Sequence, residues 1–94
     1  MKLTLTLHAG LESLFNQQKK LELALDDSIT PVSLIPWIRD NLLSGDPKQQ
    51  LVVDDAIRPG ILYMINDADW TLVDADSPLN DGDEIALIST IHGG

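Results

Sequence analysis

The chain has 94 residues, of which 44% are hydrophobic and 22% charged, and its formal net charge is −9. This length predicts one domain with a modest core, which leaves little room for a deep catalytic cleft. The acidic surface would repel the phosphates of nucleic acids and anionic lipids, so we expect neither direct nucleic-acid binding nor membrane binding. The charge either favours a basic protein partner through steering or only maintains solubility.

The chain contains no cysteine, which excludes disulfides, thiolate metal sites and a cysteine nucleophile. Its first seven residues alternate leucine with polar residues and form no apolar signal segment. No apolar run is long enough to span a bilayer. We therefore expect a cytoplasmic protein.

The first predicted element is a strand over residues 2–8, where leucines alternate with polar side chains. Gly10 breaks this pattern, and residues 11–18 are predicted to form a long connection with its own apolar anchors. A second alternating segment follows over residues 20–25. Two such strands predict an antiparallel hairpin with one exposed face.

A helix is predicted next, because apolar residues repeat at helical spacing at Leu34, Ile35, Ile38, Leu42 and Leu43. Thr30 is one candidate N-cap, with Pro31 at the first helical position, and Ser33 is the other. A helix that begins at Thr30 would lose one backbone hydrogen bond at Pro36, so the sequence favours the later start or a kink. Residues 45–47, Gly-Asp-Pro, are expected to end the helix.

The second half of the chain predicts four strands, over residues 51–53, 61–65, 70–73 and 84–91. The segment 61–65 is almost continuously apolar, as expected of a central strand covered on both faces. Turns are predicted at residues 58–60, 66–69 and 81–83. This order predicts an α+β fold in which one main helix packs across a mixed sheet, and the β-grasp is its leading arrangement. We expect one domain over residues 1–91 and a flexible tail over 92–94.

The search for catalytic groups yields no internal constellation. Two carboxylate pairs stand out, Asp67 with Asp69 and Asp74 with Asp76, but neither has the glycine and glutamate that an EF-hand loop requires. Turn formation is the simpler explanation of all four. His8 and His92 are too few for a histidine-rich metal site, and we expect no metal.

The chain ends in Gly93-Gly94, directly after the last predicted strand. Glycine has no Cβ, so such an end can pass through a channel too narrow for other residues. The tail suits a carboxylate that another enzyme must reach, although frayed termini are also common. His92 lies near this carboxylate, and a contact with a partner or with solvent is favoured over an acid–base role.

Several stretches resemble the ubiquitin-related modifier family, whose members are sulfur carriers and also protein modifiers. The matching stretches are residues 10–15, 57–61, 62–70, 81–85 and 89–94. The most specific part of the resemblance is a pair of motifs, Asn66-Asp67-Ala68-Asp69-Trp70 and the ending Thr90-Ile91-His92-Gly93-Gly94. Departures are Ala9, Pro36 and Ile91, and none changes the two terminal glycines.

The resemblance implies that the protein is a substrate of enzymes and not itself an enzyme. An activating enzyme with sulfurtransferase activity would adenylate the Gly94 carboxylate with ATP, and sulfur delivery would leave a thiocarboxylate there. That sulfur would serve a tRNA thiolation enzyme in 2-thiolation of wobble uridine, and the activated terminus could also be joined to lysines of target proteins. Gly93 would be the slender neighbour, Ile91 and His92 would contact the partner, and the carrier would hold no cofactor.

Two alternatives stay open. A sulfur carrier of molybdopterin or thiamine biosynthesis would share the β-grasp and the Gly-Gly end, but the turn over residues 66–70 and His92 argue against it. The second alternative belongs to another functional class: a non-catalytic β-grasp interaction module whose tail is inert.

Overall fold

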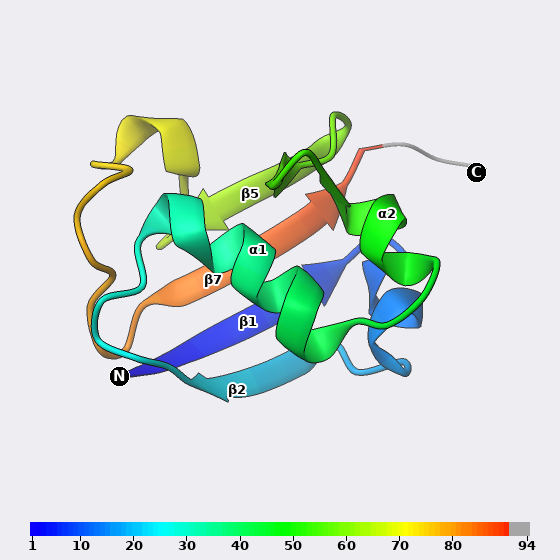
Figure 1. Cartoon of the computed structure of the whole chain (residues 1–94), viewed down its shortest axis with the longest axis horizontal. Coiled ribbons are helices and arrows are strands. Elements are labelled where there is room, and N and C mark those ends of the chain that lie inside the picture. The colour runs from blue at the N-terminus through cyan, green and yellow to red at the C-terminus, as the bar shows by residue number, and fades with distance from the viewer. Residues whose placement is uncertain (91–94) are drawn as a thin grey trace.

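The sheet is built around a parallel pair of strands, β1 (Lys2–His8) and β7 (Glu84–Ser89). A computed structural model describes residues 1–90 of the chain. Antiparallel β2 (Lys20–Ala24) lies beside β1, while β5 (Ile61–Ile65) and β6 (Ala68–Asp69) continue the sheet beyond β7. The strand order is therefore β2-β1-β7-β5-β6, with β1 and β7 near the middle (Figure 1).

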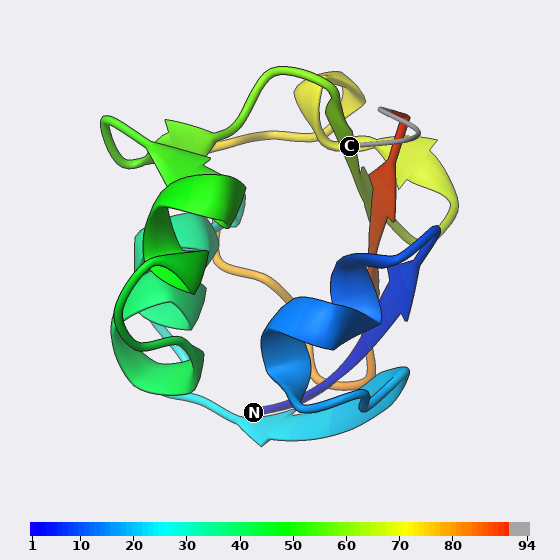
Figure 2. The same cartoon turned by 90° about the vertical axis from the view of Figure 1, so that its right-hand side faces the viewer.

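The helical elements lie on one face of this sheet and leave the other face open (Figure 2). They are α1 (Pro31–Leu42), α2 (Pro47–Leu51) and the 3-10 helix η1 (Leu11–Phe15). A small second sheet, β3 (Val52–Val53) with β4 (Ala56–Ile57), follows α2. A second 3-10 helix, η2 (Trp70–Leu72), follows β6. The predicted α+β arrangement, with one main helix across a mixed sheet, is confirmed.

The core forms between the inward face of the sheet and α1. The alternation predicted for residues 2–8 is observed, because the three leucines of β1 are buried and its polar residues face outward. On α1, Leu34, Ile35 and Ile38 are buried as predicted, and Leu42 packs against the same core. The connection after β1 contributes Leu11 and Phe15, which confirms its predicted apolar anchors.

The helix begins earlier than the sequence favoured. Thr30 is the N-cap and Pro31 the first residue, so the predicted preference for a cap at Ser33 is wrong. The two hydroxyl groups form a capping box: Ser33 N donates to Thr30 Oγ1 over 3.1 Å, and Thr30 N donates to Ser33 Oγ over 2.8 Å. Pro36 lies inside the helix and removes only the bond to Val32, a residue that is 47% exposed and open to water.

Two strand predictions in the second half also need correction. Residues 70–73 do not form a strand, because β6 ends at Asp69 and the chain turns at once into η2. The segment 61–65 is not covered on both faces, since only Tyr63 and Ile65 are buried and Leu62 is 41% exposed. The apolar run therefore reflects an apolar open face and not a second covering layer.

Smaller differences concern element ends and short elements. β7 ends at Ser89, earlier than residue 91. The short helix α2 and the strand β4 were not predicted, whereas the strand expected over residues 51–53 is present as β3. The hairpin turn after β5 is reduced to Asn66 and Asp67, both with positive φ (51° and 66°), which is the geometry of a two-residue type I′ turn.

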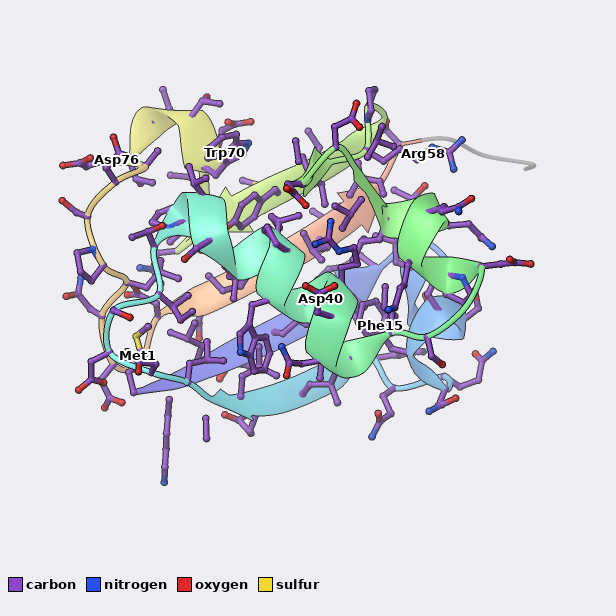
Figure 3. All side chains as sticks on the ribbon, in the orientation of Figure 1. Met1, Phe15, Asp40, Arg58, Trp70 and Asp76 are labelled. Carbon is purple, nitrogen blue, oxygen red and sulfur yellow. The ribbon has the colours of Figure 1, made fainter. Side chains whose placement is uncertain are left out.

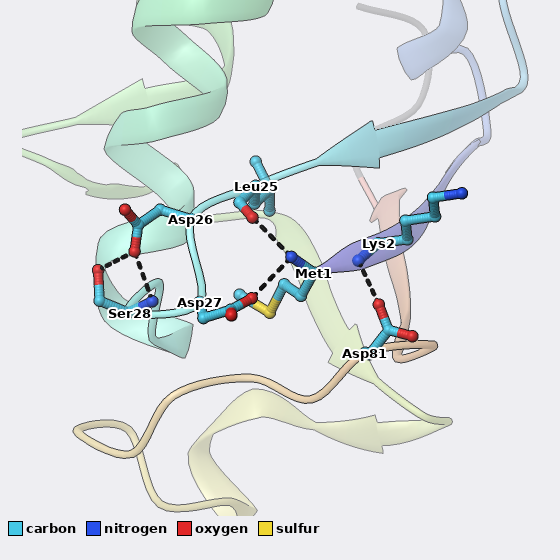
Figure 4. Close-up of polar contacts among 7 residues, drawn as sticks. All are labelled: Met1, Lys2, Leu25, Asp26, Asp27, Ser28 and Asp81. Atoms are coloured by element: carbon cyan, nitrogen blue, oxygen red, sulfur yellow. Dashed lines mark hydrogen bonds and ion pairs between the residues drawn. The ribbon is translucent and has the colours of Figure 1, made fainter.

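The end of the sheet where β1 begins is tied together by polar contacts (Figure 4). The amino group of Met1 donates to the Leu25 carbonyl and to Asp27 Oδ1, both over 2.7 Å. The Lys2 amide donates to Asp81 Oδ1 over 2.6 Å, which attaches the loop before β7. Asp26 accepts hydrogen bonds from the hydroxyl and the amide of Ser28, and these hold the pKa of its carboxyl below the usual value.

Ile38 tests the packing of α1. It is fully buried, at 0% exposure, so Ile38→Ala removes methyl groups from the centre of the core. We expect the free energy of unfolding to fall by about 2–5 kcal/mol in chemical denaturation. The exposed Val32→Ala on the same helix is the control and should change it by less than about 0.5 kcal/mol. A loss at Ile38 no larger than at Val32 would show that the helix faces the sheet differently.

Tyr63 joins β5 to the start of α1. Its side chain is 2% exposed, its hydroxyl donates to the Pro31 carbonyl over 2.9 Å, and its ring stacks on Trp70 with centroids 5.6 Å apart. Burial raises the pKa of the phenol above its usual value, because the charged phenolate would lose its hydration.

The raised pKa predicts a loss of stability in alkali. Above about pH 10 the unfolded chain ionises Tyr63 while the folded chain keeps it neutral, so unfolding is increasingly favoured. Tyr63→Phe should lower the free energy of unfolding by about 1 kcal/mol at pH 8, through the lost hydrogen bond. The difference in the free energy of unfolding between the two proteins should then become smaller as the pH rises past about 10, because only the native protein loses stability there. The measurement is urea denaturation of both proteins at a series of pH values that extends above about 10. A difference in the free energy of unfolding that stays constant across this series would show that the phenol ionises freely in the folded state.

Candidate functional site

The residues predicted to carry the function, Ile91, His92, Gly93 and Gly94, lie outside the described residues. The structure describes the chain up to Thr90, and so it shows the support from which these residues continue. This support is built from β7 and from the turn between β4 and β5.

Thr90 is fixed to that turn by two hydrogen bonds to a single acceptor. The Thr90 amide donates to the Gly60 carbonyl over 2.8 Å, and its hydroxyl Oγ1 donates to the same oxygen over 2.6 Å. Gly60 can present its carbonyl in this way because it has a φ of 95°, in the region that favours glycine. Pro59 precedes it, and the Ile61 amide donates to the Arg58 carbonyl over 3.1 Å, as in a type II turn.

The turn over residues 58–60 is itself anchored in the core. The Arg58 amide donates to the carbonyl of Leu51 over 2.8 Å, and Leu51 is fully buried. The predicted turn at residues 58–60 is therefore confirmed, and its role is to fix the end of β7. A tail that starts from Thr90 starts from a defined point of the fold.

The open face of the sheet next to Thr90 is partly apolar. Leu62 on β5 pairs with Ile88 on β7, and Met64 pairs with Ala86, all pointing away from the helix. On β1 this face carries Thr6 and His8, whose ring Nε2 lies 3.0 Å from Thr6 Oγ1. A shallow hollow over these strands is bordered by charged side chains, among them Lys20, Asp67 and Glu84. Such a mixture of apolar centre and charged border suits contact with a protein.

The carboxylate pairs serve turns, as predicted. Asp69 accepts hydrogen bonds from the amide and hydroxyl of Thr71, over 2.9 and 2.6 Å, and so caps η2. Asp74 accepts from the Ser77 hydroxyl over 2.7 Å and from the Asp76 amide over 3.1 Å. These hydrogen bonds hold the pKa of Asp69 and that of Asp74 below the usual carboxyl value.

Among residues 1–90, no group of three or more His, Asp or Glu side chains is placed to hold a metal ion. Within the same range, no helix has the length and apolar character that crossing a bilayer requires. His8 lies on β1, whereas His92 lies outside the described residues.

The sequence did not predict the pairing of Thr90 with Gly60 or the fixed position of Arg58. The signal was present in the Arg-Pro-Gly turn, but nothing in the residue spacing tells which carbonyl the last strand will reach. It also missed the contacts of Arg39, which donates from Nε to Asp40 Oδ1 over 2.8 Å and from a terminal nitrogen to Asp55. The contact with Asp55 joins α1 to the β3–β4 turn.

Comparison with known proteins gives consistent matches along the whole chain. The family model described as Urm1 (ubiquitin related modifier) matches residues 2–94. The ubiquitin-related modifier 1 homolog of Dictyostelium discoideum is 46% identical over 97 residues, which covers 100% of both chains. The solution structure of Urm1 from Trypanosoma brucei has a TM-score of 0.71 at 33% identity and covers 99% of this chain and 95% of that one.

The solution structure of Haloferax volcanii HVO 2177 has a TM-score of 0.75 at 22% identity and covers 100% of this chain and 87% of that one. At this identity it is similar in fold only. The arrangement shared with these structures is the ubiquitin-like β-grasp, and the predicted fold is confirmed.

Thr90→Val tests the support of the tail, because it keeps the shape and the amide hydrogen bond but removes the hydroxyl. We expect the amide hydrogens of residues 90 and 61 to exchange faster, while the free energy of unfolding falls by no more than about 1 kcal/mol. Thr4→Val is the control, since Thr4 Oγ1 donates to Glu22 on the open face and not to the turn. Unchanged exchange at residue 90, or equal effects of both variants, would show that the hydroxyl does not fix the strand end.

Proposed function

This chain belongs to the ubiquitin-related modifier family of ubiquitin-like sulfur carriers, and we propose that its Gly94 carboxylate is activated and loaded with sulfur. The observation that carries the proposal is the match of the family model through residue 94, which includes the two terminal glycines. The carrier is then the substrate of a partner enzyme and holds no cofactor itself.

Activation and sulfur loading take place on the partner enzyme in three steps. The Gly94 carboxylate attacks the α-phosphate of ATP, which releases pyrophosphate and leaves an acyl adenylate, a far better electrophile than the carboxylate. A persulfide of the activating enzyme then displaces AMP and forms an acyl disulfide. A second thiol of the enzyme attacks the inner enzyme sulfur, so that a disulfide forms on the enzyme and the thiocarboxylate leaves on Gly94.

The described structure supports this proposal through the fixed start of the tail. Both hydrogen bonds of Thr90 to Gly60 place the last described residue at the end of a central strand. An activating enzyme that binds the folded domain would therefore meet the start of the tail at a constant position relative to its binding surface. Gly93 leaves space beside the acyl carbon, and Ile91 with His92 contact the entrance of the partner's channel.

The open face of the sheet beside Thr90 supplies a surface that the activating enzyme can bind. Leu62 is 41% exposed and pairs with Ile88 next to the strand end, so the two side chains offer an apolar centre for contact with a protein. We propose that the activating enzyme covers this pair while the tail enters its active site.

The loaded sulfur is proposed to pass to a tRNA thiolation enzyme that modifies wobble uridine in the cytoplasm. The net charge of −9 makes direct binding of tRNA by the carrier unfavourable, so the transfer enzyme holds the RNA. The same activated terminus is proposed to form an amide with lysines of target proteins when an amine replaces the sulfur nucleophile.

Intact mass spectrometry tests the proposal. After incubation with the family's activating enzyme, ATP and a sulfur donor, the protein mass should increase by one sulfur-for-oxygen exchange at Gly94. Omission of ATP is the control. An unchanged mass with an enzyme that loads a known family member would contradict the proposal and favour an inert interaction module.

Removal of Gly93 and Gly94 should abolish partner-dependent ATP–pyrophosphate exchange and sulfur loading. The free energy of unfolding should change by less than about 0.5 kcal/mol, because a terminal glycine pair contributes no side-chain packing. The measurements are pyrophosphate exchange and thermal melting. Exchange by the truncated protein at the rate of the intact one would show that Gly94 is not the activated residue.

Gly94→Ala is the matched variant, since it keeps a carboxylate at the same position. Its methyl group crowds the acyl carbon, so we expect slower exchange than in the native protein but more than in the truncated one. Exchange equal to that of the native protein would show that the partner's channel does not select for glycine.

A further inference from the structure

Two large apolar side chains are exposed beside the start of α1. Leu72 on η2 is 79% exposed, and Val32 in the first turn of α1 is 47% exposed. The Val32 amide donates to the Ala75 carbonyl over 3.4 Å, so the first turn of α1 lies against the segment that follows η2. Single exposed apolar residues are common on proteins, but here Val32 also borders a hollow, and Leu72 lies on the short helix that begins with Trp70.

The hollow opens between the start of α1, β4 and η2. Its apolar lining includes Val32, Ile57 and Trp70, and Asp55 stands at its border. The Trp70 ring stacks on buried Tyr63 with centroids 5.6 Å apart, yet Trp70 itself is only half-buried, so part of the indole stays accessible. Tryptophan is among the side chains that contribute most to binding energy at protein contacts. The hollow beside Trp70 therefore suits a large apolar side chain of a partner.

The charge beside this hollow has one sign. Residues 66–83, which include η2, hold six aspartates and neither lysine nor arginine. Arg39, the cation of α1, is already bonded to Asp40 and to Asp55 at the border of the hollow. The aspartates around η2 thus attract a basic partner, and they repel a second copy of this chain, whose net charge is −9.

The hollow is separate from the face that we assign to the activating enzyme. Since β5 runs antiparallel to β7 and η2 follows the hairpin at the end of β5, η2 lies where β7 begins and not where Thr90 lies. Figure 3 shows Trp70 and Asp76 on that side of the molecule. Tyr63, which supports Trp70, faces the core, whereas its neighbour Leu62 faces the open side of the sheet. A partner bound at the hollow therefore leaves the open face and the end of β7 free.

We propose that Val32, Trp70 and Leu72 form a second docking surface, the η2 surface, for a basic protein segment that carries a large apolar side chain. That side chain enters the hollow beside Trp70 and contacts Leu72. Arginine or lysine residues next to it lie over the accessible part of the indole and beside the aspartates of residues 66–83. The contact needs no chemistry at Gly94, so it forms equally before and after sulfur loading.

The first test is an NMR titration of the isotope-labelled protein with three synthetic peptides. One peptide places leucine between arginines, the second replaces the leucine by serine, and the third replaces the arginines by glutamine. We expect the first peptide to shift the amide signals of residues 32, 70 and 72 and the indole N–H signal of Trp70. It should bind about 10-fold more tightly than either of the others, because it alone has both the apolar and the charged groups. Added salt should weaken its binding.

Two pairs of variants locate the contact. Leu72→Ser removes an exposed apolar side chain from the η2 surface, and Leu62→Ser does the same on the open face. Asp76→Asn removes one charge beside η2, and Asp46→Asn removes one at the start of α2, where its side chain makes no capping bond. We expect Leu72→Ser to raise the Kd of the first peptide about 5- to 10-fold and Asp76→Asn about twofold, with no change for either control. Thermal melting should be unchanged in all four, since these side chains are exposed.

Absence of saturable binding of the first peptide, an unchanged Kd for Leu72→Ser or signal shifts confined to the open face would overturn the inference. Equal binding of the second peptide would also overturn it, because net charge alone would then explain the attraction. Signals of η2 that move with protein concentration, without peptide, would identify a second copy as the occupant instead. The protein that lacks Gly93 and Gly94 should bind the first peptide as tightly as the native one, so failure of sulfur loading would leave this inference standing.

Discussion

The parallel pairing of β1 with β7 is the constraint on which the rest of the molecule depends. These two strands come from opposite ends of the chain, and their inward residues are among the most deeply buried of the fold. Parallel strands cannot be joined by a tight turn, and within residues 1–90 all the other elements lie in the long connection between these two. That connection places α1 over the inner face and brings β5 alongside β7. The turn that precedes β5 then fixes Thr90 through the Gly60 carbonyl.

Much of this fold could be predicted from the sequence because alternation is a local signal. Leu3, Leu5 and Leu7 identify an inward face without knowledge of what covers it, and the spacing of Leu34, Ile35 and Ile38 identifies the covering helix. The short elements could not be predicted in this way. α2 and β4 are each too short to show a period, and they form because tertiary contacts, such as those of buried Leu51, stabilise them.

The errors have local physical causes. Pro36 suggested a later helix start, but a capping box at Thr30 and Ser33 outweighs one lost hydrogen bond on an exposed surface. Trp70 and Thr71 have side chains typical of strands, yet Asp69 caps the turn that starts the 3-10 helix. For the candidate site, the sequence predicts the Arg-Pro-Gly turn and the tail, whereas the carbonyl that receives Thr90 depends on the register of β5 against β7.

The strand arrangement also determines how the protein responds to mechanical force. β1 starts at the amino-terminal end of the domain and β7 runs parallel to it towards the tail, with partners from Thr4 opposite Glu84 to His8 opposite Ile88. Traction applied between the first residues and the tail therefore acts along these strands and loads their hydrogen bonds together in shear. Bonds loaded in parallel must break at nearly the same moment, unlike those of a hairpin opened from one end. A domain attached through its tail would thus resist extension by an unfolding motor until the whole β1–β7 ladder gives way.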